Sequence, residues 1–161
     1  MVRAVTFTVR REVLVSSRRL WEVLGDFGAE HRCASNIAVC RRDTEHVGVG
    51  TVRSCILTRP LMGRASVAEE LVEYAPGRTL AYRLHGGAGP FRSAEGRWTI
   101  RAGAPNRSAD RETTYVEVSG HLVPRGPLTG LLLSGPARAL ARRAARASLA
   151  DLAAYVERPS S

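Results

Sequence analysis

The feature that most constrains the fold is a run of five segments in which apolar and polar residues alternate, separated by connections that contain Gly or Pro. Such alternation is typical of strands, and strands joined by tight turns pair antiparallel, because a parallel pair needs a long crossover. The run therefore excludes a doubly wound parallel sheet. The predicted strands are 50–58, 65–74, 78–85, 91–101 and 113–123.

The residues before this run predict one strand, two short helices and another strand. Alternation over 5–15 predicts the first strand. Ser16 or Ser17 can cap a short helix that ends near Gly25. The other elements expected here are a helical turn at 29–33 and a strand at 37–42, which brings the sheet to about seven strands.

The last segment, 128–157, is rich in Ala and Leu and predicts one long helix, broken or kinked at Gly135–Pro136 because proline lacks an N–H group. The fold class is therefore α+β, a seven-stranded curved antiparallel sheet around a long C-terminal helix. Small residues on the helix leave volume for a cavity, although close approach of helix and sheet explains them equally well. The core-facing candidates are Ala137, Leu140, Ala141, Ala144, Ala145, Leu149 and Leu152.

Chain length and charge limit the domain count and the partners. The 161 residues fit one domain, expected over 1–157 with a disordered tail at 158–161. All 24 basic residues are Arg, and the formal net charge is +9. They are spread along the chain without a dense run or aromatic interleaving, so a solvated basic surface is expected and nucleic acid is not. A basic surface can still dock an acidic protein.

The cysteines and the apolar runs indicate the compartment. Cys33, Cys40 and Cys55 are odd in number and lack a CxxC spacing, and no signal-peptide pattern precedes Val5. We therefore expect a cytoplasmic protein with reduced thiols. The longest apolar stretch, 128–133, is too short to span a membrane.

Counting strand register predicts a charged pair on one face of the sheet. A turn centred near Leu61 places Arg53 opposite Glu69. A second turn at 75–78 pairs Glu69 with Leu84, Leu71 with Tyr82 and Glu73 with Leu80. The face expected to be concave carries Arg53, Cys55, Leu57, Glu69, Leu71, Leu80, Tyr82 and Leu84.

Whether the Arg53–Glu69 pair indicates a functional site depends on whether it is buried. If the face is covered by the helix, Arg53 and Glu69 form an ion pair inside an apolar cavity, where charges are costly and are often kept for binding or chemistry. The alternative is a solvated pair on the convex face.

The same parity continues into the later strands and then becomes ambiguous. It brings Arg92, Ala94, Gly96, Trp98 and Ile100 to the concave side. On the last strand, Val116 and Val118 share one face while Tyr115, Glu117, Ser119 and His121 share the other, and either set can point inward. An inward His121 could serve as a general base.

Motifs of other function classes are missing from the sequence. It has no phosphate-binding glycine loop, no HExxH and no nucleophile elbow. The four histidines, His31, His46, His85 and His121, lack the spacing of metal ligands. We therefore expect neither a metal nor a cofactor.

Several segments together resemble the START-like helix-grip superfamily (SRPBCC), in particular its polyketide cyclase/dehydratase type. The resemblance covers nearly the whole chain and implies the helix-grip fold. The segments are Leu20–Leu24 with Asp26–Gly28, Gly48–Arg53, Glu69–Leu71, Arg78–Tyr82 and Thr114–Gly126. The sequence departs from the family pattern after the first helices. Cys33 and Ser35 stand where relatives often carry Trp and Pro, and Ala34 stands where some carry a basic residue.

The resemblance implies a cavity that opens between the loops 58–63 and 86–92 and the long helix. It also implies a polar cluster of Arg53, Glu69 and Glu117, which are the expected catalytic residues. It implies an enzyme that promotes cyclisation, aldol closure or dehydration of a polyketide. The basic surface could then dock an acidic acyl carrier protein. The alternative is a non-catalytic carrier of a hydrophobic small molecule or lipid. The expected substrate-binding residues are Cys55, Leu57, Leu61, Leu71, Tyr82, Leu84, Phe91, Trp98 and His121.

Overall fold

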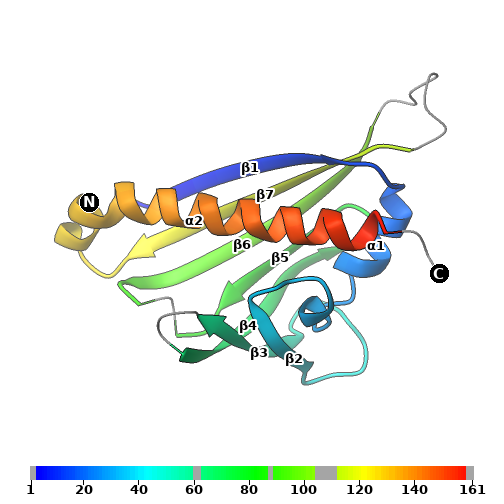
Figure 1. The fold of residues 1–161 in the computed structure, drawn as a ribbon. Coiled ribbons are helices and arrows are strands. Elements are labelled where there is room, and N and C mark those ends of the chain that lie inside the picture. Colours follow the sequence, from blue (N-terminus) through cyan, green and yellow to red (C-terminus); the bar gives the residue numbers. More distant parts are fainter. Residues whose placement is uncertain (1–2, 60–62, 87–88, 104–111, 159–161) are drawn as a thin grey trace.

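The computed structural model describes residues 3–59, 63–86, 89–103 and 112–158. Within them one seven-stranded antiparallel sheet has the strand order β1-β7-β6-β5-β4-β3-β2, and a long helix lies across its concave face (Figure 1). The strands are β1 (Val5–Val13), β2 (Ile37–Arg42), β3 (Val52–Arg59), β4 (Gly63–Ala75), β5 (Thr79–Leu84), β6 (Phe91–Ala102) and β7 (Thr114–Pro124). The helices are α1 (Ser17–Leu24), the 3-10 turn η1 (Glu30–Arg32) and α2 (Pro127–Val156).

The short helix α1 forms where its end signals predict. The Ser16 side chain accepts a hydrogen bond from the Arg19 N–H at 3.1 Å, and the chain leaves the helix at Gly25. Leu20 and Leu24, four residues apart, are its buried side chains, so the helix docks by one face. This places the following loop, with η1, beside β2.

The predicted register of the central strands is confirmed, with one shift. Arg53 lies opposite Glu69, and Glu69 lies opposite Leu84. A bulge after Leu71 then sets Glu73 against Ala81 instead of Leu80. A bulge adds one residue to one strand and changes the pairing beyond it, and the chain pattern alone does not locate it.

The helix α2 is one continuous element, so of the predicted break or kink at Gly135–Pro136 the break is wrong. Pro136 is exposed, on a side of the helix that faces away from the sheet. The carbonyl oxygen that loses its helical hydrogen bond there can be hydrated, which makes the interior proline tolerable.

The core is concentrated at the carboxyl-terminal half of α2. Ala145, Leu149 and Leu152 are buried, and they pack with Leu20, Phe27, Leu71, Leu80 and Val116. Two of the predicted core-facing residues are exposed instead, Leu140 at 69% and Ala144. The amino-terminal half contacts the sheet through small, half-buried residues such as Ala137 and Ala141.

Cys40 and Cys55 form a disulfide, so the prediction of reduced thiols is wrong for these two residues. They lie directly opposite each other on β2 and β3, with their Cα atoms 4.1 Å apart. Register between an edge strand and its neighbour, not sequence spacing, brings them together. Cys33 is free.

Two further predictions concern the ends of the chain and the membrane. No helix in the described residues is long and apolar enough to cross a bilayer. Of the tail predicted to be disordered, 159–161 lie outside the described residues.

Candidate functional site

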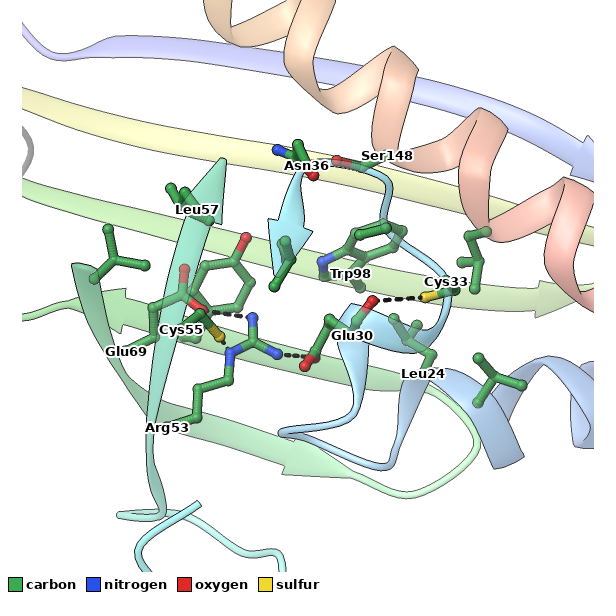
Figure 2. A pocket seen from close by; sticks show the side chains of 16 residues that line it. Leu24, Glu30, Cys33, Asn36, Arg53, Cys55, Leu57, Glu69, Trp98 and Ser148 are labelled. Atoms are coloured by element: carbon green, nitrogen blue, oxygen red, sulfur yellow. Dashed lines mark hydrogen bonds and ion pairs between the residues drawn. The ribbon is translucent and has the colours of Figure 1, made fainter. Parts of the chain in front are cut away.

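A cavity of about 180 Å³ lies between the concave face of the sheet, the carboxyl-terminal half of α2 and the segment around η1 (Figure 2). Its polar lining residues are Glu30, Cys33, Asn36, Arg53, Glu69, Tyr82, Trp98 and Ser148. The other lining residues are the disulfide-bonded Cys55 and the apolar residues Val23, Leu24, Ala34, Ile37, Leu57, Val67 and Leu152.

Arg53 on β3 is the central charged group of this cavity, and only 5% of it is exposed. Its Nε and Nη2 atoms both lie 2.5 Å from Oε2 of Glu69 on β4. Its Nη1 atom forms an ion pair with Oε1 of Glu30 from η1. One guanidinium is thus shared by two carboxylates from opposite sides (Figure 2).

Two aromatic rings also hold the guanidinium in place. The Arg53 Cζ atom lies 4.0 Å from the centroid of the Phe27 ring and 5.1 Å from that of Tyr82. A cation over an aromatic face is attracted by the ring quadrupole, and more strongly when both are desolvated. Arg53 therefore has a fixed position, and the two carboxylates occupy three of its five N–H groups.

Glu30 reaches Arg53 because the loop after α1 folds tightly against β2. Gly28 has φ +123°, and its backbone N–H donates a hydrogen bond of 3.1 Å to Glu30 Oε2. A side chain at Gly28 would also collide with Cγ of Arg42. The loop therefore needs glycine at this position to present Glu30 to the cavity.

Tyr82 on β5 and Trp98 on β6 form the aromatic wall of the cavity. Burial, and secondly the negative charge of Glu69, raise the pKa of Tyr82 to about 12. The phenol therefore keeps its proton across the physiological range and can donate a hydrogen bond to a ligand oxygen.

The segment beside η1 is fastened to α2. Both carboxylate contacts of Asp151 are made through Oδ2, which accepts hydrogen bonds from the Ser35 backbone N–H at 2.9 Å and its hydroxyl at 2.7 Å. Next to this anchor, burial and then the charge of Asp151 raise the pKa of the Cys33 thiol. The wall formed by Cys33, Ala34 and Asn36 is thus held against the helix that closes the cavity.

The structure brings most of the predicted polar cluster together but replaces its third member. Arg53 and Glu69 meet in the cavity, as the register predicts. Glu117 does not: it lies on the outer face of β7, where its Oε2 atom accepts a 2.5 Å hydrogen bond from Arg10 Nε. Val116 and Val118 take the inward positions of that strand and are buried.

Glu30, and not Glu117, is the third member of the polar cluster. Strand register could not predict Glu30, because this residue does not belong to a strand. It belongs to a loop, where side-chain direction depends on local turns that have no simple period. The one available signal is its position directly after the Asp26–Gly28 segment, in the predicted helical turn.

Four of the predicted substrate-binding residues line the cavity, namely Cys55, Leu57, Tyr82 and Trp98. His121 does not, because it is exposed on the outer face of β7 opposite Thr6. Leu71 and Phe91 are buried in packing away from the cavity lining, and Leu84 is half-buried outside it.

Several predictions concern the start of β6 or residues outside the described ranges. A register shift between Phe91 and Ser93 leaves Arg92 exposed instead of on the concave side. Leu61 lies outside the described residues, as do parts of both loops predicted to form the cavity mouth, at 60–62 and 87–88.

Solved structures share this fold at low sequence identity. The di-domain ARO/CYC StfQ from the steffimycin biosynthetic pathway matches with TM-score 0.76 and 15% identity, over 96% of this chain and 51% of that chain. The chain thus spans about half of that protein.

Two further structures match over nearly their whole length. The Zhui aromatase/cyclase from Streptomyces sp. R1128 has TM-score 0.69 and 22% identity, over 98% of this chain and 95% of that one. Ara h 8.0201 has TM-score 0.74 and 14% identity, over 96% and 98%. These likenesses establish the helix-grip fold.

Sequence comparison places the chain in a family. None of the curated proteins matches it. The family described as polyketide cyclase / dehydrase and lipid transport matches residues 4–157, which is nearly the whole chain. The protein therefore belongs to the polyketide cyclase / dehydrase and lipid transport family.

Proposed function

We propose that the protein is a polyketide cyclase/dehydratase-like enzyme that holds a small carbonyl compound in its cavity and promotes aldol closure or dehydration in natural-product biosynthesis. The observation that carries this proposal is the buried Arg53, held between Glu30 and Glu69 on the cavity wall. Family membership and the aromatase/cyclase neighbours support the same reaction class.

The cluster can supply the groups that aldol chemistry requires. A carboxylate of Glu69 or Glu30 takes a proton from the carbon between two carbonyl groups, and the Arg53 guanidinium stabilises the resulting enolate oxygen. The enolate carbon then forms a bond to a second carbonyl carbon. The new alkoxide recovers the proton from the carboxylic acid, so the closure is proton-neutral.

Dehydration can follow on the same groups. The carboxylate again removes the proton next to the remaining carbonyl. The resulting carboxylic acid gives that proton to the β-hydroxyl, which leaves as water, so the dehydration is also proton-neutral. Tyr82, whose pKa is raised to about 12, is a hydrogen-bond donor to a substrate oxygen and not a base. Trp98 provides an aromatic wall for positioning a planar ring.

The size of the cavity limits how much of a substrate reacts in it. A cavity of about 150 Å³ holds benzene, whereas drug-sized ligands occupy roughly 300–1,000 Å³. The 180 Å³ here therefore accommodates about one ring. We propose that one ring closes in the cavity while the rest of a longer chain stays outside.

The experiment incubates the purified protein with a short synthetic poly-β-ketone thioester and follows the products by mass spectrometry. The expected products are cyclised isomers and their dehydrated forms, formed faster than in buffer. Arg53→Gln should lower the rate at least roughly a hundredfold, as loss of a transition-state donor does. The matched control, Arg83→Gln, alters an exposed pair with Glu95 and should leave the rate unchanged.

A ligand that binds but is recovered unchanged would contradict the enzyme and favour the alternative, a non-catalytic carrier of a hydrophobic small molecule. Equal rates for Arg53→Gln and the parent protein would overturn the assigned site.

Two further parts of the proposal concern partner and location. The formal charge of +9 supports an acidic acyl carrier protein as the donor of substrate, which a salt-dependent binding titration would test. We also propose a cytoplasmic location, although disulfides are rare there. A Cys40–Cys55 bond found after rapid thiol trapping in intact cells would count against that location.

A further inference from the structure

The amino-terminal half of α2 carries an unusual set of exposed leucines. Leu128, Leu131 and Leu132 are 71%, 78% and 71% exposed, and Leu140 is 69% exposed. Leu133 is exposed at 39%. These five residues are here called the leucine end. Four of them lie in the first two turns of α2, which begins at the end of the molecule opposite α1 (Figure 1), and Leu140 follows about two turns later.

The five leucines do not form a single narrow apolar face that could pack against the core. At about 100° per residue, their directions cover an arc of about 200° around the helix. The remaining side faces the sheet through the small residues Gly130, Ser134, Ala137 and Ala141, all half-buried. The leucines therefore point in most directions on the outward side of the helix, with Gly135, Pro136 and Ala139 exposed between them.

Arginines continue the same outward side of the helix. Arg142, Arg143 and Arg146 are exposed and lie within the arc of the leucines, within two turns after Leu140, with Arg138 beside them. No acidic residue occurs in α2 before Asp151. The surface thus combines an apolar end with an uncompensated positive patch.

From this combination we infer that the leucine end and the α2 arginines form a docking surface for an anionic lipid bilayer. A helix with leucines and arginines on its free side can lie in the interface, with the leucines among the acyl chains and the arginines at the phosphates. A bilayer also surrounds an inserted helix, so it can cover leucines that point in directions about 200° apart.

Other occupants fit the surface less well. A second copy of the chain would bring two arginine patches of the same sign together, which is unfavourable. A rigid acidic protein would satisfy the arginines, but it would cover only the part of the leucine arc that faces it. The inference rests on α2 alone and is independent of the proposed reaction.

The test is flotation of the whole protein with vesicles of phosphatidylcholine alone and of phosphatidylcholine mixed with phosphatidylglycerol. We expect binding to the anionic vesicles that weakens with added salt, and little binding to the neutral ones. Leu131→Ser/Leu132→Ser should lower the partition coefficient at least roughly tenfold, because two leucines lose their burial. Arg142→Gln/Arg143→Gln should lower it by a similar factor.

Matched controls separate this surface from the overall positive charge. Arg78→Gln/Arg101→Gln removes the same charge from exposed positions away from α2, and Leu14→Ser/Val49→Ser removes two other exposed apolar side chains. Both controls should bind like the parent protein. Unchanged thermal unfolding of all four variants would show that the fold is kept.

Three results would overturn the inference: no binding to anionic vesicles, equal losses in the α2 variants and their controls, or binding of an acyl carrier protein that the α2 variants abolish while vesicles are ignored. The last result would assign the surface to an acidic protein.

Discussion

The charged cluster in the cavity wall affects the stability of the fold. Arg53 is almost fully buried, and its charge is matched by Glu30 and Glu69, which are themselves largely buried. Burying such groups is costly, and removal of one partner leaves the others uncompensated. The cluster therefore stabilises the fold only as a complete set.

Arg53→Met should lower the free energy of unfolding by about 3–5 kcal/mol, because two carboxylates then face each other without a cation. Arg83→Met breaks an exposed pair and should cost less than about 1 kcal/mol. Urea denaturation measures both. Adding Glu30→Gln and Glu69→Gln to Arg53→Met should restore much of the loss; equal, small effects of both arginine variants would refute the burial argument.

Tyr82 gives the fold a dependence on high pH. Its pKa is raised from about 10 to about 12, so the folded state holds this proton more tightly than the unfolded state does. The resulting stability is fully present below pH 10 and is lost as the pH rises toward 12, up to about 3 kcal/mol.

Tyr82→Phe should therefore flatten the decline in unfolding free energy between pH 10 and 12, measured by urea denaturation across that interval. Absorbance titration of tyrosinate should lose its latest component in the same variant. Superimposable titrations of parent and variant would contradict the buried, protonated phenol.

The sequence predicts the Arg53–Glu69 pair because strand pairing has a period of two and a turn expected near Leu61 fixes which residues lie opposite each other. Glu117 was misplaced because β7 offers two plausible faces, and the apolar one, with Val116 and Val118, faces inward. Glu30 could not be predicted because the direction of a loop side chain follows from local contacts such as the Gly28 N–H.

At the scale of elements, α2 has two halves with different surroundings. The carboxyl-terminal half buries Leu149 at 1% exposure, whereas Leu140 in the other half is 69% exposed. Alanine substitution at Leu149 should cost about 2–5 kcal/mol, and at Leu140 less than about 0.5 kcal/mol. Thermal unfolding compares the two; similar losses would mean that the whole helix is packed.

The edge of the sheet is held by the Cys40–Cys55 bond, which closes a loop with a sequence separation of 15. Closing a loop of that length stabilises by about 3 kcal/mol in the chain-entropy account. Reduction should therefore lower the unfolding free energy by about 2–3 kcal/mol.

Cys33→Ser serves as the control for the disulfide, since Cys33 is free. That variant should respond to reductant as the parent protein does. Thiol counting in unfolded, unreduced protein should find a single reactive group; three reactive groups would contradict the bond.

For the whole molecule, element order was predictable because alternation and turn chemistry are local. The strands at 37–42, 65–74 and 91–101 formed within two residues of their predicted ends. The packing of α2 against the sheet was not predictable in the same way, because small residues permit either a cavity or close contact. The cavity lies at the carboxyl-terminal half of the helix and the close contact at the amino-terminal half. Only the packing of the complete chain determines which half of α2 borders the cavity and which half contacts the sheet closely.

The central claim is that ligands bind beside Arg53 and Trp98 in the 180 Å³ cavity. The most direct test titrates a single-ring phenol into Ala34→Phe, which fills the cavity, and into Ala144→Phe, which changes an exposed helix position. Tryptophan fluorescence, in a Trp21→Phe background that leaves Trp98 alone, reports binding. The account predicts saturable binding that is kept by Ala144→Phe and lost in Ala34→Phe; undiminished binding in Ala34→Phe would contradict it.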